Sequence, residues 1–157
     1  MGSERSDGKG AVCKFPSAQN PREALQSPDI TRCFRHYVTN IAPWYDLSDA
    51  SATFGKTLPR MALENPLLFS AILALSAMHS TKTASPGRRG MAEFYHAFCI
   101  RLLIDLDASF GLAEREAGLA SACLLRSYEI LDGGYDLDGN SPRRNGDADC
   151  RWNRRGS

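Results

Sequence analysis

The sequence predicts an all-α protein: about five helices packed as antiparallel helical hairpins, between a disordered N-terminal leader and a disordered C-terminal tail. Apolar residues recur at three- and four-residue spacing in five separate stretches, which is the pattern of a helix with one buried face. No stretch shows the alternation of apolar and polar residues that is typical of a half-buried strand. The loops between the stretches are short, and short loops favour antiparallel neighbours.

The 157 residues divide into three parts. Residues 1–28 are rich in Gly and Pro and have few large apolar side chains, so they are predicted to be a flexible leader. Residues 29–132 hold all the helical stretches and form the predicted domain. Residues 133–157 are polar and have few residues that could join a core, so they are predicted to be a disordered tail.

The first predicted helix has Asp29 near its start and ends at Pro43. Its apolar face is made by Ile30, Cys33, Phe34, Tyr37, Val38 and Ile41. Residues 42–49, APWYDLSD, follow as a predicted turn. A short second helix is then indicated, and Pro59 must lie in its first turn or kink it. The apolar residues that indicate this helix are Phe54, Leu58, Met61 and Ala62.

The third predicted helix contains the most apolar run of the chain, Leu67 to Met78. Asn65 supplies an N-cap and Pro66 a proline at the first helical position. A bilayer needs about twenty apolar residues, and this run has twelve, interrupted by Ser70 and Ser76. The run therefore predicts a helix buried on nearly all sides, and not a membrane span.

Two amphipathic helices are predicted after a loop at residues 81–90. The first has an apolar face made by Met91, Phe94, Tyr95, Phe98, Leu102, Leu103 and Leu106. The second ends at Gly133 and Gly134. Its apolar face is predicted from Leu119, Cys123, Leu124, Tyr128 and Leu131.

Charge and cysteine usage exclude several classes of protein. The three parts of the chain carry +4 and −3, +10 and −11, and +5 and −4 charges, so none is a basic arm that would bind nucleic acid through its phosphates. The five cysteines form no C-x-x-C pair, which argues against a zinc signature and a disulfide framework. The first 28 residues lack the apolar segment of a secretion signal, so a reducing compartment is expected.

The histidines His36, His79 and His96 are the obvious catalytic candidates, but a structural role is favoured for each. None of them stands in a pattern that supplies a paired ligand or an orienting group. Nucleophile elbows, phosphate-binding glycine loops and metalloprotease motifs do not occur. No catalytic, cofactor-binding or metal-binding residue is therefore predicted, and an enzyme is not expected.

Residues 136–147 partly imitate a calcium loop, with Asp136, Asp138, Asn140 and Asp147 at the first, third, fifth and twelfth places. Ser141 replaces the turn glycine and the twelfth residue is not Glu, so a solvated turn is predicted instead.

Three Ser-Pro pairs begin at Ser27, Ser85 and Ser141, and they are either sites of proline-directed phosphorylation or ordinary turn formers. Arg88 and Arg89 beside Ser85 make a small positive patch that could hold a phosphate, although charged loop tips are usually only solvated.

Four blocks of the sequence, in this order, resemble the regulatory (middle homology) domain of fungal-specific transcription factors, the zinc binuclear cluster or six-cysteine proteins. They are APWYDLSD (42–49), FGKTLPRMALENPLLFSAILALSAMHS (54–80), AEFYHAFCIRLLIDL (92–106) and LLRSYEILD (124–132). The resemblance extends over about residues 29–132. It implies an α-helical domain that lies C-terminal to a zinc-cluster DNA-binding head and regulates RNA polymerase II transcription in the nucleus.

The resemblance also sets expectations about cofactors and partners. The six-cysteine head does not occur in this chain, so zinc and DNA are expected only through that head, and a truncated member of the family is expected. Protein partners or self-association are expected, and a membrane is not. The matching residues best interpreted as structural are Trp44, Asp46, Pro59, Pro66, His79, Tyr95, His96, Arg126 and Glu129. The alternative is a stand-alone helical scaffold that binds a partner helix or peptide through exposed apolar surface.

Overall fold

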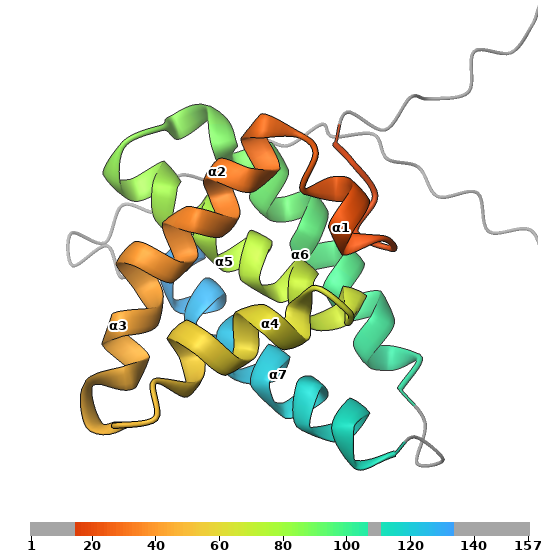
Figure 1. The fold of residues 1–157 in the computed structure, drawn as a ribbon. Helices are drawn as coiled ribbons and strands as arrows, with labels where there is room; N and C mark the ends of the chain where they lie inside the picture. Colours follow the sequence, from red (N-terminus) through yellow and green to blue (C-terminus); the bar gives the residue numbers. More distant parts are fainter. Residues whose placement is uncertain (1–14, 107–110, 134–157) are drawn as a thin grey trace, which may run out of the picture.

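The computed structural model describes residues 15–106 and 111–133, and every regular element in these ranges is helical, which confirms the all-α prediction (Figure 1). No helix in these ranges is long and apolar enough to cross a bilayer. The helices are α1 (Pro21–Ala24), α2 (Pro28–His36), α3 (Ala42–Tyr45), α4 (Leu58–Ala62), α5 (Pro66–Thr83), α6 (Arg89–Ile104) and α7 (Leu112–Asp132). Two π turns (Tyr37–Ile41, Thr53–Thr57) and two 3₁₀ turns (Asp46–Ser48, Pro86–Arg88) lie between them.

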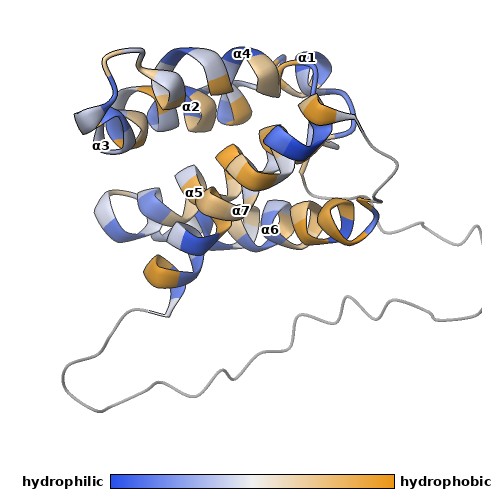
Figure 2. Cartoon of the chain, turned by 90° about the horizontal axis from the view of Figure 1, so that it is seen from below, coloured by the Kyte–Doolittle hydropathy of each residue, from blue (hydrophilic) through white to orange (hydrophobic). Residues whose placement is uncertain are grey.

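The helices α1 to α4 form one layer and α5 and α6 lie in a second, and α7 crosses obliquely in front of both (Figure 2). Helix α5 lies at the centre and contacts α2, α4, α6 and α7. All twelve residues from Leu67 to Met78 are buried, which confirms the prediction of a helix buried on nearly all sides. The predicted start is also confirmed, because the Leu68 N–H donates to Asn65 Oδ1 at 3.1 Å and Pro66 is the first helical residue.

A pair of buried hydrogen bonds joins α2 to α5, and we call it the α2–α5 clasp. The Ser76 hydroxyl donates to the carbonyl of Cys33 at 2.6 Å, and the Cys33 thiol donates to the carbonyl of Leu73 at 3.5 Å. Both donors are fully buried. The serine that interrupts the apolar run therefore has a partner, so burying its hydroxyl carries no large desolvation penalty.

The prediction that the first helix ends at Pro43 and continues as a turn is wrong. The chain stays helical through the π turn Tyr37–Ile41 into α3, and then through Asp46–Ser48. Pro43 lies in the first turn of α3, where its missing N–H is tolerated. The π turn before it is wider than an α turn, so the proline ring does not meet the carbonyl one regular turn earlier.

The prediction of an unstructured leader is wrong for residues 15–28. The Phe15 ring packs 5.6 Å from the Phe94 ring, and the Tyr95 hydroxyl donates to the carbonyl of Pro16 at 2.7 Å. Ala18 is fully buried. A few small side chains suffice here because large rings on α6 supply most of the contact area. Residues 1–14 and 134–157 lie outside the described residues.

Helix α7 differs most from its prediction. It begins at Leu112, well before Leu119, and it turns a different face toward α5. Leu119 is 71% exposed and Cys123 is also exposed, although both were assigned to the buried face. The buried face combines three small residues with three large ones: Ala117, Gly118, Ser121, Leu124, Leu125 and Tyr128.

Candidate functional site

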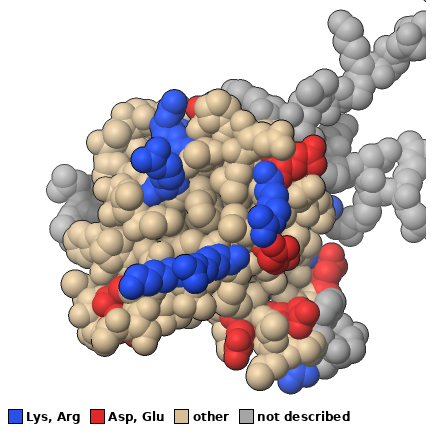
Figure 3. All heavy atoms as spheres, in the orientation of Figure 1, with Lys and Arg blue, Asp and Glu red and all other residues tan. Residues whose placement is uncertain are grey.

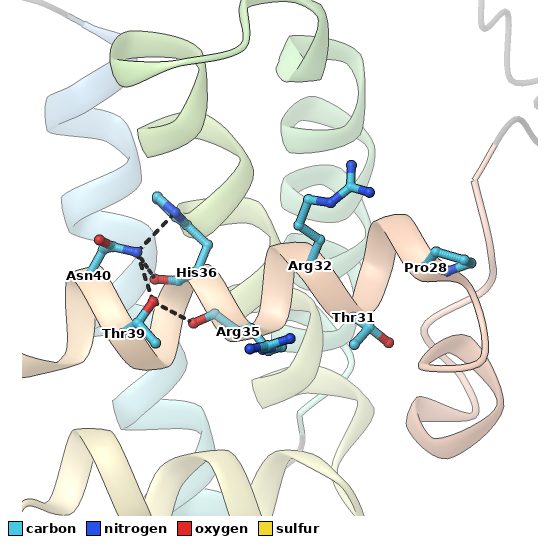
Figure 4. Close-up of a pocket in the computed structure, with 7 residues that line it drawn as sticks. All are labelled: Pro28, Thr31, Arg32, Arg35, His36, Thr39 and Asn40. Carbon is cyan, nitrogen blue, oxygen red and sulfur yellow. Dashed lines mark hydrogen bonds between the residues drawn. The ribbon is translucent and has the colours of Figure 1, made fainter.

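A shallow, open groove follows the outer side of α2, and we call it the α2 groove (Figure 4). All its lining residues come from α2 and the π turn after it, at the three- and four-residue spacing of one helix face. They are Pro28, Thr31, Arg32, Arg35, His36, Thr39 and Asn40. The groove gathers two arginines and one histidine. It is therefore the first place to look for chemistry.

His36 contacts His79, a partly buried residue of α5, with His36 Nε2 2.9 Å from His79 Nδ1. The Asn40 amide nitrogen lies 3.1 Å from His36 Nδ1 and also donates to the His36 carbonyl. Because an amide N–H faces Nδ1, the proton of neutral His36 lies on Nε2 and is donated to His79. The sequence placed Asn40 near His36 but gave no sign of His79, which is 43 residues away.

Burial lowers the pKa of His36 below its ordinary value of 6.5, and the nearby His79 and Arg88 lower it further. A proton added at Nδ1 would also point at the Asn40 amide and remove that contact. The neutral imidazole is therefore the form that the fold selects.

We expect the protein to become less stable as the pH falls through the histidine range. His36 and His96 both have a pKa lowered in the folded state, so the unfolded chain binds protons first and their stabilisation is lost as the pH drops below 6.5. Urea unfolding at about pH 7.5 and about pH 5.5 measures the difference.

The double substitution His36→Gln and His96→Gln should flatten this pH dependence, whereas Arg32→Gln, a change to an exposed cation on the same helix, should leave it intact. An unchanged pH dependence in the double variant would show that His36 and His96 do not cause the loss of stability at low pH.

His96 lies on α6 and stacks on the ring of Tyr128 from α7, with centroids 4.3 Å apart and 15° between the planes. Burial lowers its pKa, against opposing effects of Glu129 and Asp132. Its Nε2 is buried and has no hydrogen-bond partner within the described part of the chain. The ring therefore acts as a packing element between α6 and α7.

The buried cysteines are poor nucleophiles and poor metal ligands. Burial raises the pKa of Cys33 to about 11 and that of Cys99 to about 12, so both thiols stay protonated near neutral pH. Within residues 15–106 and 111–133, no group of three His, Cys, Asp or Glu side chains is placed to hold a metal ion.

The block APWYDLSD forms α3 and the 3₁₀ turn Asp46–Ser48, and Asp46 ties this segment to the residues that follow it. Its carboxylate accepts the backbone N–H of Phe54 at 2.8 Å and that of Gly55 at 2.7 Å. The neighbouring Asp49 accepts the N–H groups of Ser51 and Thr53, and hydrogen bonds to Thr53 and Ser51 lower the pKa of this exposed carboxyl. The matching block is therefore a scaffold that fixes the connection from α3 to α4.

Two contacts of Tyr45 that the sequence did not reveal attach this segment to the rest of the protein. Tyr45 stacks on Phe54 with ring centroids 4.6 Å apart, and its hydroxyl hydrogen-bonds the Ser127 hydroxyl on α7. Trp44, one residue earlier, is 75% exposed instead of packed. Pro59 lies in the first turn of α4, one of the two positions that the sequence allows.

The Ser-Pro pairs that the structure describes both stand where a helical turn begins. Ser27 is the residue before α2 and Ser85 the residue before the turn Pro86–Arg88. Arg89 is held by two carboxylates, Glu93 at 2.9 Å and Asp132 at 2.6 Å, so only Arg88 of the predicted patch lacks a carboxylate partner in the described ranges. The Ser141 pair and the calcium-like loop at 136–147 lie outside the described residues.

Arg126 and Glu129, two of the residues interpreted as structural, form an ion pair at 3.7 Å, and because both side chains are exposed the pair adds little stability.

Charged side chains on the face shown in Figure 3 lie in separate clusters of both signs, which fits the even charge distribution of the sequence. A comparison with protein families finds that a model described as a fungal specific transcription factor domain matches residues 32–137. This match covers more than half of the chain and contains all four blocks that carry the resemblance. No curated protein and no solved structure matches.

Proposed function

The chain belongs to the family of the fungal-specific transcription factor domain, and from that membership we propose that it is the regulatory and protein-interaction portion of a factor that controls RNA polymerase II transcription in the nucleus. Membership implies a regulator and not an enzyme. The family match over residues 32–137 is the observation that carries the proposal, because it spans most of α2 and all of α3 to α7.

Two features of the described residues support an interaction role. Large apolar side chains stand exposed on the surface, which is typical of surfaces that bind other proteins. They are Trp44, Leu47, Ile104, Leu112, Leu119 and Ile130. No part of the sequence concentrates basic residues into a stripe for phosphates. DNA and zinc are accordingly proposed to be bound by a six-cysteine head, and this domain is proposed to contact protein partners.

A reporter assay tests the proposal. The full chain, fused to an unrelated DNA-binding domain in yeast, should change transcription of a reporter relative to that DNA-binding domain alone. A fusion that carries Phe69→Ala, a change in the core, should lose the effect. The variant Leu47→Ala, changed at an exposed position, should fold normally, and its reporter output shows whether this surface residue contributes to the effect.

Equal reporter output from the fusion and from the DNA-binding domain alone, at equal protein levels, would count against a regulatory role. It would favour the stand-alone scaffold, which binds a helix or peptide without acting on transcription.

A further inference from the structure

The outer side of α7 carries an apolar stripe directly opposite the face that packs on α5. Leu112 is 74% exposed, Leu119 71% and Ile130 52%, and Cys123 is also exposed. In Figure 2, α7 crosses in front of the other helices, so its outer side is turned toward the viewer. Exposing three large aliphatic side chains on one helix face is costly in water, and such a face usually has a partner.

The spacing of the stripe indicates what kind of partner fits. With the charged residues Glu116 and Arg126 included, its positions follow one another at alternating steps of four and three residues, the repeat of a coiled-coil seam. The seam runs through 112, 116, 119, 123, 126 and 130. A helix with this repeat packs its seam against that of a second helix.

We propose that two copies of this chain pair through the outer stripes of α7, with the two helices antiparallel about a two-fold axis at the level of Ser121. In this arrangement Leu112 lies beside Ile130 of the second copy, and Leu119 beside Cys123 of the second copy. The two-fold axis generates both contacts twice, as a symmetric dimer interface requires. Ser121 itself faces α5 and is fully buried.

Charge selects both the partner and its direction. The same register places Glu116 beside Arg126 of the second copy, so the two charged positions of the seam meet with opposite signs. The flanking positions Arg115 and Glu129 of the second copy also meet with opposite signs. A parallel pair would instead place Glu116 on Glu116 and Arg126 on Arg126, which is unfavourable.

A second copy of the chain would be one protein partner of the domain. The dimer proposal does not depend on the proposed role in transcription. Sedimentation reports whether copies pair, and the reporter assay reports transcription. Failure of one measurement therefore leaves the other interpretable.

Sedimentation velocity of the full chain over a concentration series, with a reducing agent to prevent disulfide links, tests the pairing. The wild type should be monomeric at the lowest concentrations of the series and should form a dimer by its upper end, at about 100 µM. Leu119→Lys should abolish it, whereas Leu47→Lys, at an 81% exposed position away from α7, should not. Both sites are exposed, so both variants should keep the wild-type unfolding temperature.

The direction of pairing is tested by exchanging charges. Glu116→Arg and Arg126→Glu should each weaken the dimer by about tenfold, because each creates two like-charge contacts. The double variant restores opposite charges in the antiparallel register and should return to within about threefold of the wild-type affinity.

A protein that stays monomeric throughout the series would overturn the proposal. A dimer that is insensitive to Leu119→Lys, or one in which the double charge variant fails to recover, would overturn it equally, because another surface or a parallel arrangement would then be responsible.

Discussion

Replacing Phe69 with alanine is expected to lower the free energy of unfolding by about 3–5 kcal/mol. Phe69 is fully buried near the start of α5, and its ring packs 5.6 Å from the ring of Phe34 on α2. The substitution removes this contact and leaves a cavity between the two layers. A domain of this size has about 5–15 kcal/mol of stability in total, so the variant should be close to unfolded at growth temperature.

Urea unfolding followed by circular dichroism measures this change, and Leu47→Ala is the control. Leu47 is 81% exposed, so its replacement should change the free energy of unfolding by less than about 0.5 kcal/mol. Similar losses in the two variants would mean that α5 is not the core of the folded state.

Replacing Asp46 with alanine is expected to cost about 2 kcal/mol. The carboxylate accepts two backbone N–H groups, from Phe54 and Gly55, and both would lose their partner in a partly buried turn. The space is also tight, since a Cβ on Gly55 would lie 3.0 Å from Asp46 Oδ2. The turn that connects α3 to α4 should therefore loosen, and amide exchange of Phe54 and Gly55 should accelerate.

Asp46→Asn separates the hydrogen bonds from the charge. The amide oxygen can accept one N–H but its nitrogen cannot accept the other, so the loss should be smaller than for alanine. Asp49→Ala should cost less than Asp46→Ala, because one of the two backbone hydrogen bonds that Asp49 accepts, from Ser51, lies at an exposed position, whereas both that Asp46 accepts are partly buried. The assignment fails if Asp49→Ala is as costly as Asp46→Ala.

The centre of the fold was predictable because its signals are local and agree with one another. Asn65 and Pro66 define the start of α5, and the apolar run that follows has no polar face to place in water. The amphipathic pattern of α6 likewise gives its limits to within two residues. In both cases capping, spacing and composition favour the same conformation.

The orientation of α7 was not predictable in the same way. Its apolar residues form two stripes, and hydrophobicity alone selected one that includes the exposed Leu119. The buried face begins with Ala117 and Gly118, which carry little apolar surface, and a Cβ added at Gly118 would lie 3.6 Å from Leu106 Cδ1. Close packing is a property of two surfaces together, and one sequence pattern does not reveal it.

The contacts of the candidate site were missed for a related reason. The hydrogen bond between His36 and His79 joins residues that are 43 apart in the chain, and the bond between Tyr45 and Ser127 joins residues that are 82 apart. Neither belongs to a motif with a known spacing. The way in which the helices pack decides which of these side chains meet, so such contacts can be found only when the fold is known.

The α2–α5 clasp has a consequence for the protein during its synthesis. Cys33 leaves the ribosome 40 residues before Leu73 and 43 residues before Ser76, its partners in the clasp. At common elongation rates of about 5–20 residues per second, that gap lasts about 2 to 8 s. For this time the apolar face of α2 lacks the central helix on which it packs, so the N-terminal layer reaches its final packing only after α5 has been made.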